Sequence, residues 1–135
     1  MSYKIQDIEG IGPTYGEKLA GFGINTTEDL LKHCADPKGR KALEEKSGIG
    51  GSLILKWTNK ADLMRISGVG SEYSDLLEAA GVDTVKELKM RRADNLTAKM
   101  LEVNAAKNLT RNPPAESVVA KWIEAAKTLP PTLTY

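Results

Sequence analysis

The chain repeats itself at a distance of 58 residues. Shifting the sequence by this amount places Ile8 to Tyr15 (IEGIGPTY) over Ile66 to Tyr73 (ISGVGSEY). Thirteen of the 38 positions from 8 to 45 are identical, whereas composition alone predicts roughly two or three. A repeat of this size is one structural unit, so the sequence predicts a duplicated domain.

The end of the repeat matches at a larger shift. At 65 residues, Lys56-Trp57 falls on Lys121-Trp122. The second copy therefore carries seven extra residues, the difference between the two shifts, and we place them between Asn108 and Ala115, where Pro113-Pro114 occurs. We divide the chain into a first repeat (1–62), a second repeat (63–129) and a tail (130–135).

The predicted fold class is all-α. β-branched and aromatic residues are too sparse for strands, and no segment alternates apolar with polar residues. Pro13 suits a first helical position, and Thr26 has capping-box spacing to Asp29, as Thr84 has to Glu87. Short helices are predicted near residues 3–8, 13–21, 27–35, 37–47 and 51–66, then 71–80, 84–92, 95–106 and 115–128. Residues 52–66 contain neither Gly nor Pro, and the helix at 51–66 is predicted to connect the two copies.

The motif with the most functional information is the turn Gly10-Ile11-Gly12 and its copy Gly68-Val69-Gly70. Its spacing, with a small residue four positions later (Gly16, Ser74), is that of a helix-hairpin-helix. Glycines allow positive φ and a turn too tight for side chains, and the apolar residue between them points inward. Because the turn leads directly into a helix, unpaired N–H groups face outward and favour an anion.

Each copy as a whole resembles the five-helix domain, with two helix-hairpin-helix elements, at the N-terminus of archaeal and eukaryotic strand-exchange recombinases. Thr26-Thr27-Glu28-Asp29-Leu30 matches a characteristic helix of that domain, and Ser47-Gly48-Ile49-Gly50-Gly51-Ser52 matches its weaker second hairpin. As a tandem, the chain is similar to a mainly bacterial family of duplicated helix-hairpin-helix proteins. The resemblance covers roughly residues 4 to 129 and implies two SAM-like repeats sharing a connecting helix.

The resemblance implies contact with DNA phosphates, independent of base sequence, through hairpin amides and nearby cations. The DNA-binding residues it implies are Gly10, Gly12, Thr14 and Lys18 of the first hairpin, Lys46, Gly48, Gly50, Gly51, Ser52 and Lys56 around the weaker second hairpin, and Gly68, Gly70 and Ser71 of the second copy. The site around Gly48 combines amides, a hydroxyl and two cations, and is therefore the favoured anion site. It departs from the family pattern in having Ile54 where a small residue is expected.

The second copy fits phosphate binding less well. Glu72, Asp75 and Glu78 follow its hairpin, and carboxylates there repel a phosphate. Its counterpart of the weaker hairpin has lost the Gly-x-Gly pattern and reads Asn104-Ala105-Ala106-Lys107-Asn108. We therefore expect the second copy to have lost the ligand or to bind a protein partner.

Other features favour structural interpretations. Trp57 and Trp122 occupy matching apolar positions, which predicts core packing rather than base stacking. Two clusters of basic residues are interpreted as solvated helix faces in preference to patches that bind a DNA groove. They are Lys38-Arg40-Lys41 and Lys86-Lys89-Arg91-Arg92. His33 and Cys34 cannot complete a zinc site alone, and Arg91-Arg92 replace them in the copy.

Two functions follow as hypotheses. The first is a non-catalytic module that binds duplex or branched DNA, mainly through the first repeat; the second is a protein-interaction adaptor built on the same helices. The net charge of +1, from 19 basic and 18 acidic residues, excludes a strongly basic nucleic-acid coat and favours the adaptor. No set of side chains forms an enzyme site, a metal site or a nucleotide loop, and no cofactor is expected. The resemblance leaves open whether the hairpin carbonyls hold a monovalent cation, as they often do in relatives. The start of the sequence lacks a signal peptide and no apolar run could span a membrane, so a cytoplasmic protein without membrane contact is expected.

Overall fold

The computed structural model describes residues 3–135, and helices form nearly all of its regular structure. No β-strand occurs in this part of the chain; one isolated antiparallel bridge joins Lys4 to Thr26. The prediction of an all-α protein is confirmed. In chain order the elements are the 3₁₀ helix η1 (Ile5–Asp7) and the α-helices α1 (Pro13–Ala20), α2 (Thr27–Cys34), α3 (Pro37–Ser47), α4 (Gly51–Leu63), α5 (Ser71–Ala79), α6 (Val85–Leu88), α7 (Ala93–Lys107) and α8 (Glu116–Thr128).

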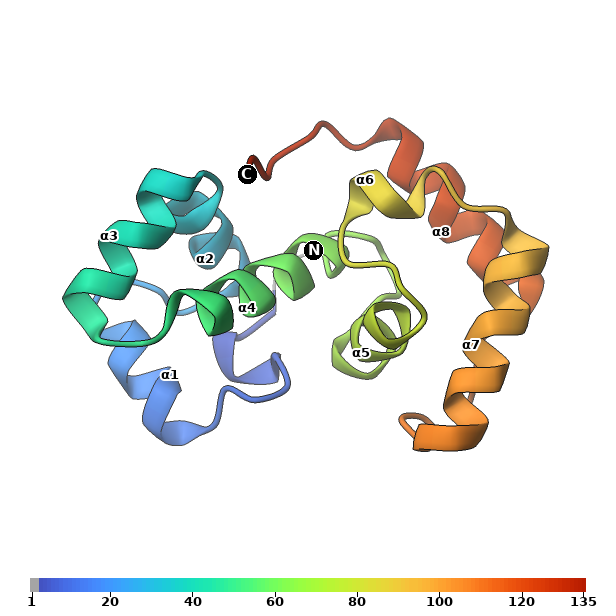
Figure 1. The fold of residues 1–135 in the computed structure, drawn as a ribbon, viewed down its shortest axis with the longest axis horizontal. Helices are drawn as coiled ribbons and strands as arrows, with labels where there is room; N and C mark the ends of the chain where they lie inside the picture. Colours follow the sequence, from blue (N-terminus) through green and yellow to red (C-terminus); the bar gives the residue numbers. More distant parts are fainter. Residues whose placement is uncertain (1–2) are drawn as a thin grey trace.

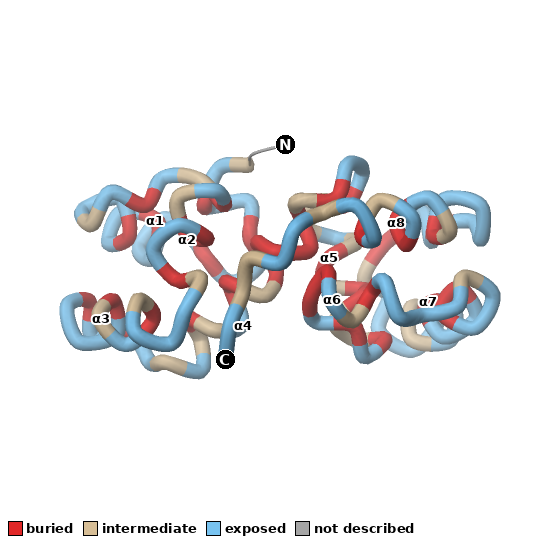
Figure 2. The backbone as a smooth tube through the Cα atoms, turned by 90° about the horizontal axis from the view of Figure 1, so that it is seen from above, coloured by how far each residue is buried: buried red, intermediate tan, exposed pale blue. Residues whose placement is uncertain are grey.

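Buried apolar residues form two clusters, one on each side of the molecule. The first gathers residues of η1 and α1–α4, and the second gathers residues of α5–α8 together with Leu63 and Ile66. Helix α4 runs through the middle of the molecule between these two groups of helices (Figure 1). Seen from above, the buried segments lie inside each group and the exposed ones surround them (Figure 2). Each half therefore has its own hydrophobic core.

Equivalent positions of the two halves make equivalent contacts. Gly10 and Gly68 have φ values of 94° and 91°, and a Cβ added to either would lie 3.5 or 3.4 Å from the indole nitrogen of Trp57 or Trp122. The rings of Tyr15 and Trp57 lie 5.1 Å apart between centroids, and those of Tyr73 and Trp122 also lie 5.1 Å apart. Both tryptophans are buried, as the sequence predicted. The same turn is thus packed on the same aromatic pair in each half.

Helix α6 is much shorter than the predicted 84–92, and this prediction is wrong. Its counterpart α2 buries Leu31 and Cys34 on its second turn, which holds that turn against the core. The equivalent residues of the second half are Lys89 and Arg92, both exposed. Without an apolar face to bury, the second turn has little to stabilise it, and the α-helix ends at Leu88.

Helix α7 departs from the sequence alignment in its register. The alignment pairs Leu43 with Leu101, but Leu43 is buried whereas Leu101 is 49% exposed. Met100 occupies the buried position instead. Because one residue turns a helix by about 100°, a one-residue slip moves an aligned leucine from the core to the surface.

Helix α4 ends at Leu63, three residues before the predicted boundary. The next residues form a tight turn in which the Ile66 N–H donates to the Leu63 carbonyl over 3.1 Å, as the Ile8 N–H does to Ile5 over 3.2 Å. Buried polar residues connect α4 to the second half: Lys60 forms an ion pair with Asp75, and the carboxylate of Asp62 accepts the Val85 N–H at 2.8 Å. These contacts fix the orientation of α5 and α6 on α4.

The tail, residues 130–135, returns from α8 toward the first half (Figure 1). The Thr134 N–H donates to the Ala35 carbonyl over 2.8 Å, and the guanidinium of buried Arg40 donates to the Thr134 carbonyl over 2.7 Å. Arg40 also donates to the carbonyl of Cys34 at 3.0 Å. The tail therefore continues from α8 of the second half and is hydrogen-bonded to the first half.

Candidate functional site

The first hairpin, residues 10–12 and the start of α1, has exposed donors. Gly10, Gly12 and Thr14 are all exposed. The amides of Gly12 and Thr14 make no hydrogen bond to any residue from 3 to 135, and Pro13 has no amide to offer. Lys18 lies one turn after Thr14 on the same face of α1, is exposed, and has no ion-pair partner in the described part of the chain. A free helix N-terminus and a cation thus lie on one face.

Gly16, which lies behind this turn, packs against the side chain of Gln6. A Cβ added at Gly16 would lie 2.8 Å from the side chain of Gln6, which is closer than carbon atoms approach one another. The equivalent Ser74 is buried, and its hydroxyl donates to the Ser71 carbonyl at 2.9 Å. In the first half, the segment before the hairpin thus packs closely against the helix after it.

The favoured anion site, around Gly48-Ile49-Gly50, is partly filled by the protein. The carboxylate of Glu44 accepts the Gly51 N–H at 2.8 Å, and the hydroxyl of Ser47 accepts the Ile49 N–H at 3.1 Å. Gly48 has a φ of 74°, and its N–H donates to the Glu44 carbonyl at 2.9 Å. A negative charge therefore already lies at the start of α4, where a phosphate would have to bind.

The remaining residues of that site are accessible, and one of its cations is close to an acid of the second half. Lys46 and Ser52 are exposed, and Gly50 precedes α4 as its N-cap residue. Lys56 lies 3.9 Å from Glu78 of α5, a partly exposed pair that connects the two halves. Of the two cations that the sequence placed here, one thus has a carboxylate neighbour within the protein.

The second hairpin, residues 68–70 and the start of α5, has the same backbone but different surroundings. The amides of Ser71 and Glu72 make no hydrogen bond to any described residue. Tyr3 lies close to Gly70: its hydroxyl oxygen is 3.9 Å from where a Cβ would be. A shallow hollow beside the turn is lined by Tyr3, Gly68, Gly70, Ser71, Glu72, Tyr73, Thr110 and Asn112. It contains one carboxylate and no basic side chain.

The acidic residues after this hairpin are paired in part. Asp75 is bound by Lys60 and Glu78 lies near Lys56, which leaves Glu72 as the unpaired carboxylate among these three. The Tyr73 hydroxyl donates to the Asn112 carbonyl at 2.7 Å and so anchors the loop before α8. The sequence identified these acids but not their lysine partners, because Lys60 is fifteen residues from Asp75 and no local pattern connects them.

The basic clusters divide between structural and exposed residues. Arg40 is buried on backbone carbonyls, Arg91 donates to the Gly81 carbonyl at 2.9 Å, and Arg92 pairs with Asp94 at 2.9 Å. Lys86 and Lys89 are exposed and have no ion-pair partner among residues 3–135. The two clusters are therefore not continuous patches of free charge.

His33 and Cys34 do not form a common site. His33 is exposed, with Nδ1 at 2.9 Å from the Asp29 carbonyl, whereas Cys34 is fully buried. Burial raises the pKa of the Cys34 thiol to about 11, against the smaller opposing effects of Thr58 and Arg40. Within the described residues, no three His, Cys, Asp or Glu side chains gather in a way that could hold a metal ion.

Glu44 is the residue at these turns that sequence reasoning missed. It lies one turn before Gly48, so its side chain reaches over a link of only three residues to the next helix. A carboxylate one turn before a glycine that ends a helix is the signal that could have identified it.

No helix of the part from 3 to 135 has the length and apolar character needed to cross a membrane.

Residues 9–129 match a protein family described as Domain of unknown function (DUF4332). No curated protein and no solved structure matches the chain.

Proposed function

Since the chain belongs to the DUF4332 family, whose description leaves the activity open, we propose from its two turns that it is a non-catalytic module of tandem SAM-like helix-hairpin-helix repeats. The proposal assigns residues 1–62 and 63–129 to the repeats, with α4 as the connecting helix. Its support is the matched geometry of Gly10 with Trp57 and of Gly68 with Trp122. In this reading the domain holds DNA without reading its bases.

The observation that carries DNA binding is the first hairpin. Its free amides at Gly12 and Thr14 are followed on the same helix face by the unpaired cation Lys18. Backbone amides at a helix N-terminus bind phosphate oxygens without regard to base sequence, and a lysine adds a salt-dependent attraction. The first hairpin therefore replaces the turn around Gly48 as the main phosphate site.

The test is a fluorescence anisotropy titration of a labelled DNA duplex at two salt concentrations. We expect Lys18→Glu to weaken binding at low salt and to reduce the salt slope by about 1, because one phosphate contact is lost. Lys99→Glu makes the same charge change on α7, at the opposite end of the molecule from α1, and serves as the control (Figure 1). Equal losses in the two variants, or affinity indifferent to salt, would contradict the proposal.

Glu44 provides a second and opposite test. Glu44→Gln removes the negative charge at the start of α4 while keeping an oxygen for the Gly51 N–H. We expect DNA affinity to rise by about twofold to fivefold at low salt, because a carboxylate at a helix N-terminus repels phosphate. Glu45→Gln, the exposed neighbour, is the matched control. If both substitutions raise affinity equally, only net charge matters and the turn around Gly48 lies away from the DNA.

A protein partner is the second candidate function, and it concerns the second hairpin. The hollow beside Gly68 and Gly70 is lined by two tyrosines, Tyr3 and Tyr73, and has one carboxylate and no cation. Such a surface suits a neutral or basic protein segment better than a phosphate. Affinity purification with and without nuclease separates the two functions: a partner retained after nuclease treatment and lost in Glu72→Lys supports the adaptor.

A further inference from the structure

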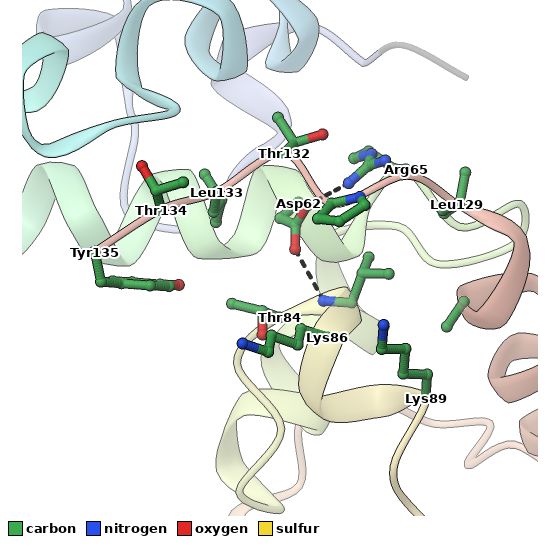
Figure 3. Close-up of a pocket in the computed structure, with 13 residues that line it drawn as sticks. Asp62, Arg65, Thr84, Lys86, Lys89, Leu129, Thr132, Leu133, Thr134 and Tyr135 are labelled. Carbon is green, nitrogen blue, oxygen red and sulfur yellow. Dashed lines mark hydrogen bonds and ion pairs between the residues drawn. The ribbon is translucent and has the colours of Figure 1, made fainter.

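A pocket of about 370 Å³ lies where the tail crosses the boundary between the two halves (Figure 3). Its walls come from α4, α6, the end of α8 and the tail itself. Small-molecule sites begin at about 300 Å³, so this pocket has the size of a site for a small ligand. It lies apart from both hairpins, and no residue assigned there to DNA lines it.

The tail wall of the pocket is held in place by specific contacts. The Arg65 guanidinium donates to the Pro130 carbonyl at 2.6 Å, and the Tyr135 hydroxyl donates to Asn59 Oδ1 at 2.8 Å. The Arg40 guanidinium carbon also lies 5.4 Å from the centre of the Tyr135 ring. Together with the bonds of Thr134, these contacts attach the tail at both ends.

The floor of the pocket is polar and already satisfied. Asp62 is buried, and its two carboxylate oxygens accept from Arg65 Nη1 at 2.7 Å and from the Val85 N–H at 2.8 Å. Arg65 and Asp62 therefore cancel each other's charge. The other polar lining residues include Thr84, whose hydroxyl accepts the Glu87 N–H and caps α6.

Two lysines without acidic partners give the pocket an excess of positive charge. Lys86 and Lys89 both come from the α6 segment, and neither forms an ion pair with any residue from 3 to 135. Figure 3 shows Lys89 directed from α6 toward the tail and Lys86 extending toward the side of Tyr135. The rest of the wall is mainly apolar: beside Thr132 and Thr134 it consists of Val85, Ala126, Leu129, Pro131, Leu133 and Tyr135. The pocket thus combines an apolar surface with a cationic rim.

We propose that this pocket binds a small ligand that has an anionic head group and an apolar body. The carboxylate, sulfonate or phosphate head is held by Lys86 and Lys89, and the body lies against the apolar wall that includes Leu129 and Leu133. A paired acid in the floor leaves no free carboxylate to repel such a ligand. The inference is independent of DNA binding, because it uses neither the hairpin amides nor Lys18.

The test uses two fluorescent probes that differ in charge. 1-Anilinonaphthalene-8-sulfonate has an aromatic body and a sulfonate, whereas N-phenyl-1-naphthylamine has the same body and no charge. We expect the double variant Lys86→Gln, Lys89→Gln to bind the sulfonate about tenfold more weakly while its affinity for the neutral probe changes less than about twofold. The variant Lys99→Gln, Lys107→Gln removes the same charge from α7 and is expected to bind both probes as the unaltered protein does.

A third variant tests the apolar wall. Leu133→Ser changes a half-buried residue of the tail and is expected to weaken the binding of both probes to a similar extent. Urea unfolding of each variant verifies that it is folded. The proposal is overturned if the unaltered protein does not bind the sulfonate, if the two lysine-pair variants bind it equally, or if Leu133→Ser leaves both affinities unchanged.

Discussion

The two hairpins share one backbone and differ in almost every exposed side chain. Gly10 and Gly68 have nearly the same positive φ, and each packs beside a buried tryptophan. Around this common turn, Pro13, Thr14 and Lys18 of the first half are replaced by Ser71, Glu72 and Leu76. The comparison teaches that glycine and core packing determine the turn, whereas the side chains around it decide whether an anion is attracted.

The weaker turns of the two halves diverge further. In the first half, three residues join α3 to α4, and Gly48 ends α3 with a φ of 74°. In the second half, α7 ends at Asn108 with a φ of 53°, and the side chain of Asn104 makes two hydrogen bonds of 3.0 Å with the backbone of Thr110. An asparagine thus takes the left-handed position of the glycine, and a side-chain amide organises the longer loop.

The largest expected effect concerns the tryptophans behind the hairpins. Trp57→Ala and Trp122→Ala each remove a buried indole from one core, and we expect each to cost roughly 3–5 kcal/mol of unfolding free energy. Urea unfolding followed by circular dichroism measures both. A large cost for one variant and a negligible cost for the other would show that the matched turns do not depend on equivalent packing.

Substitutions at aligned positions of α3 and α7 should differ in how much unfolding free energy they cost, and this cost is smaller than that of the tryptophan substitutions. A Cβ at Gly39 would lie 2.0 Å from the His33 carbonyl oxygen, a clash with backbone that only a shift of α2 or α3 relieves. We expect Gly39→Ala to destabilise the protein by about 1–3 kcal/mol. Thr97, which the alignment pairs with Gly39, already has a Cβ within α7, so Thr97→Ala adds no clash and should stay within about 1 kcal/mol. Equal thermal midpoints for the two variants would contradict this difference.

The helix caps should show a smaller difference. Thr26 accepts the Asp29 N–H at 3.0 Å and begins an eight-residue helix, whereas Thr84 accepts the Glu87 N–H at 3.3 Å and begins one of four residues. We expect Thr26→Ala to cost about 1 kcal/mol and Thr84→Ala less, since less helix depends on the cap. Chemical denaturation of both variants measures the difference, and Thr→Ser at each position is the control that keeps the hydroxyl.

The smallest effect on stability at neutral pH comes from ionisation of the Cys34 thiol. The aligned residue of the second half is the exposed Arg92. Burial raises the thiol pKa to about 11 from an ordinary value of 9.0, so the folded protein holds the proton more tightly than the unfolded chain. The resulting stability is fully present below pH 9 and is lost as the pH rises through about 11. At pH 8, a disulfide reagent should modify the native thiol at least about a hundredfold more slowly than in urea. Rapid modification of the folded protein would contradict burial of the thiol.

Most of the helices could be predicted from the sequence because their signals are local. Pro13, Pro37 and the capping threonines mark starts, and glycines mark ends, within a residue or two of the observed bounds. The predictions that were wrong depend on interactions between residues far apart in the sequence. The length of α6 depends on whether residues 89 and 92 have a core to face, and the register of α7 depends on which side of it α8 covers.

The features of the candidate site also fall into local ones, which the sequence predicts, and long-range ones, which it does not. The amino-acid sequence by itself determined the two glycine turns, their position before helices and the charges on the side chains after them, because these are properties of single residues and their near neighbours. Only the tertiary structure decided which donors and charges are still available. It placed Glu44 on the Gly51 amide, gave Asp75 to Lys60, and folded the tail over Asp62 and Arg65 to form a pocket. Hydrogen bonds and ion pairs act over a few ångströms in space, and residues far apart in sequence reach that distance only after the chain has folded.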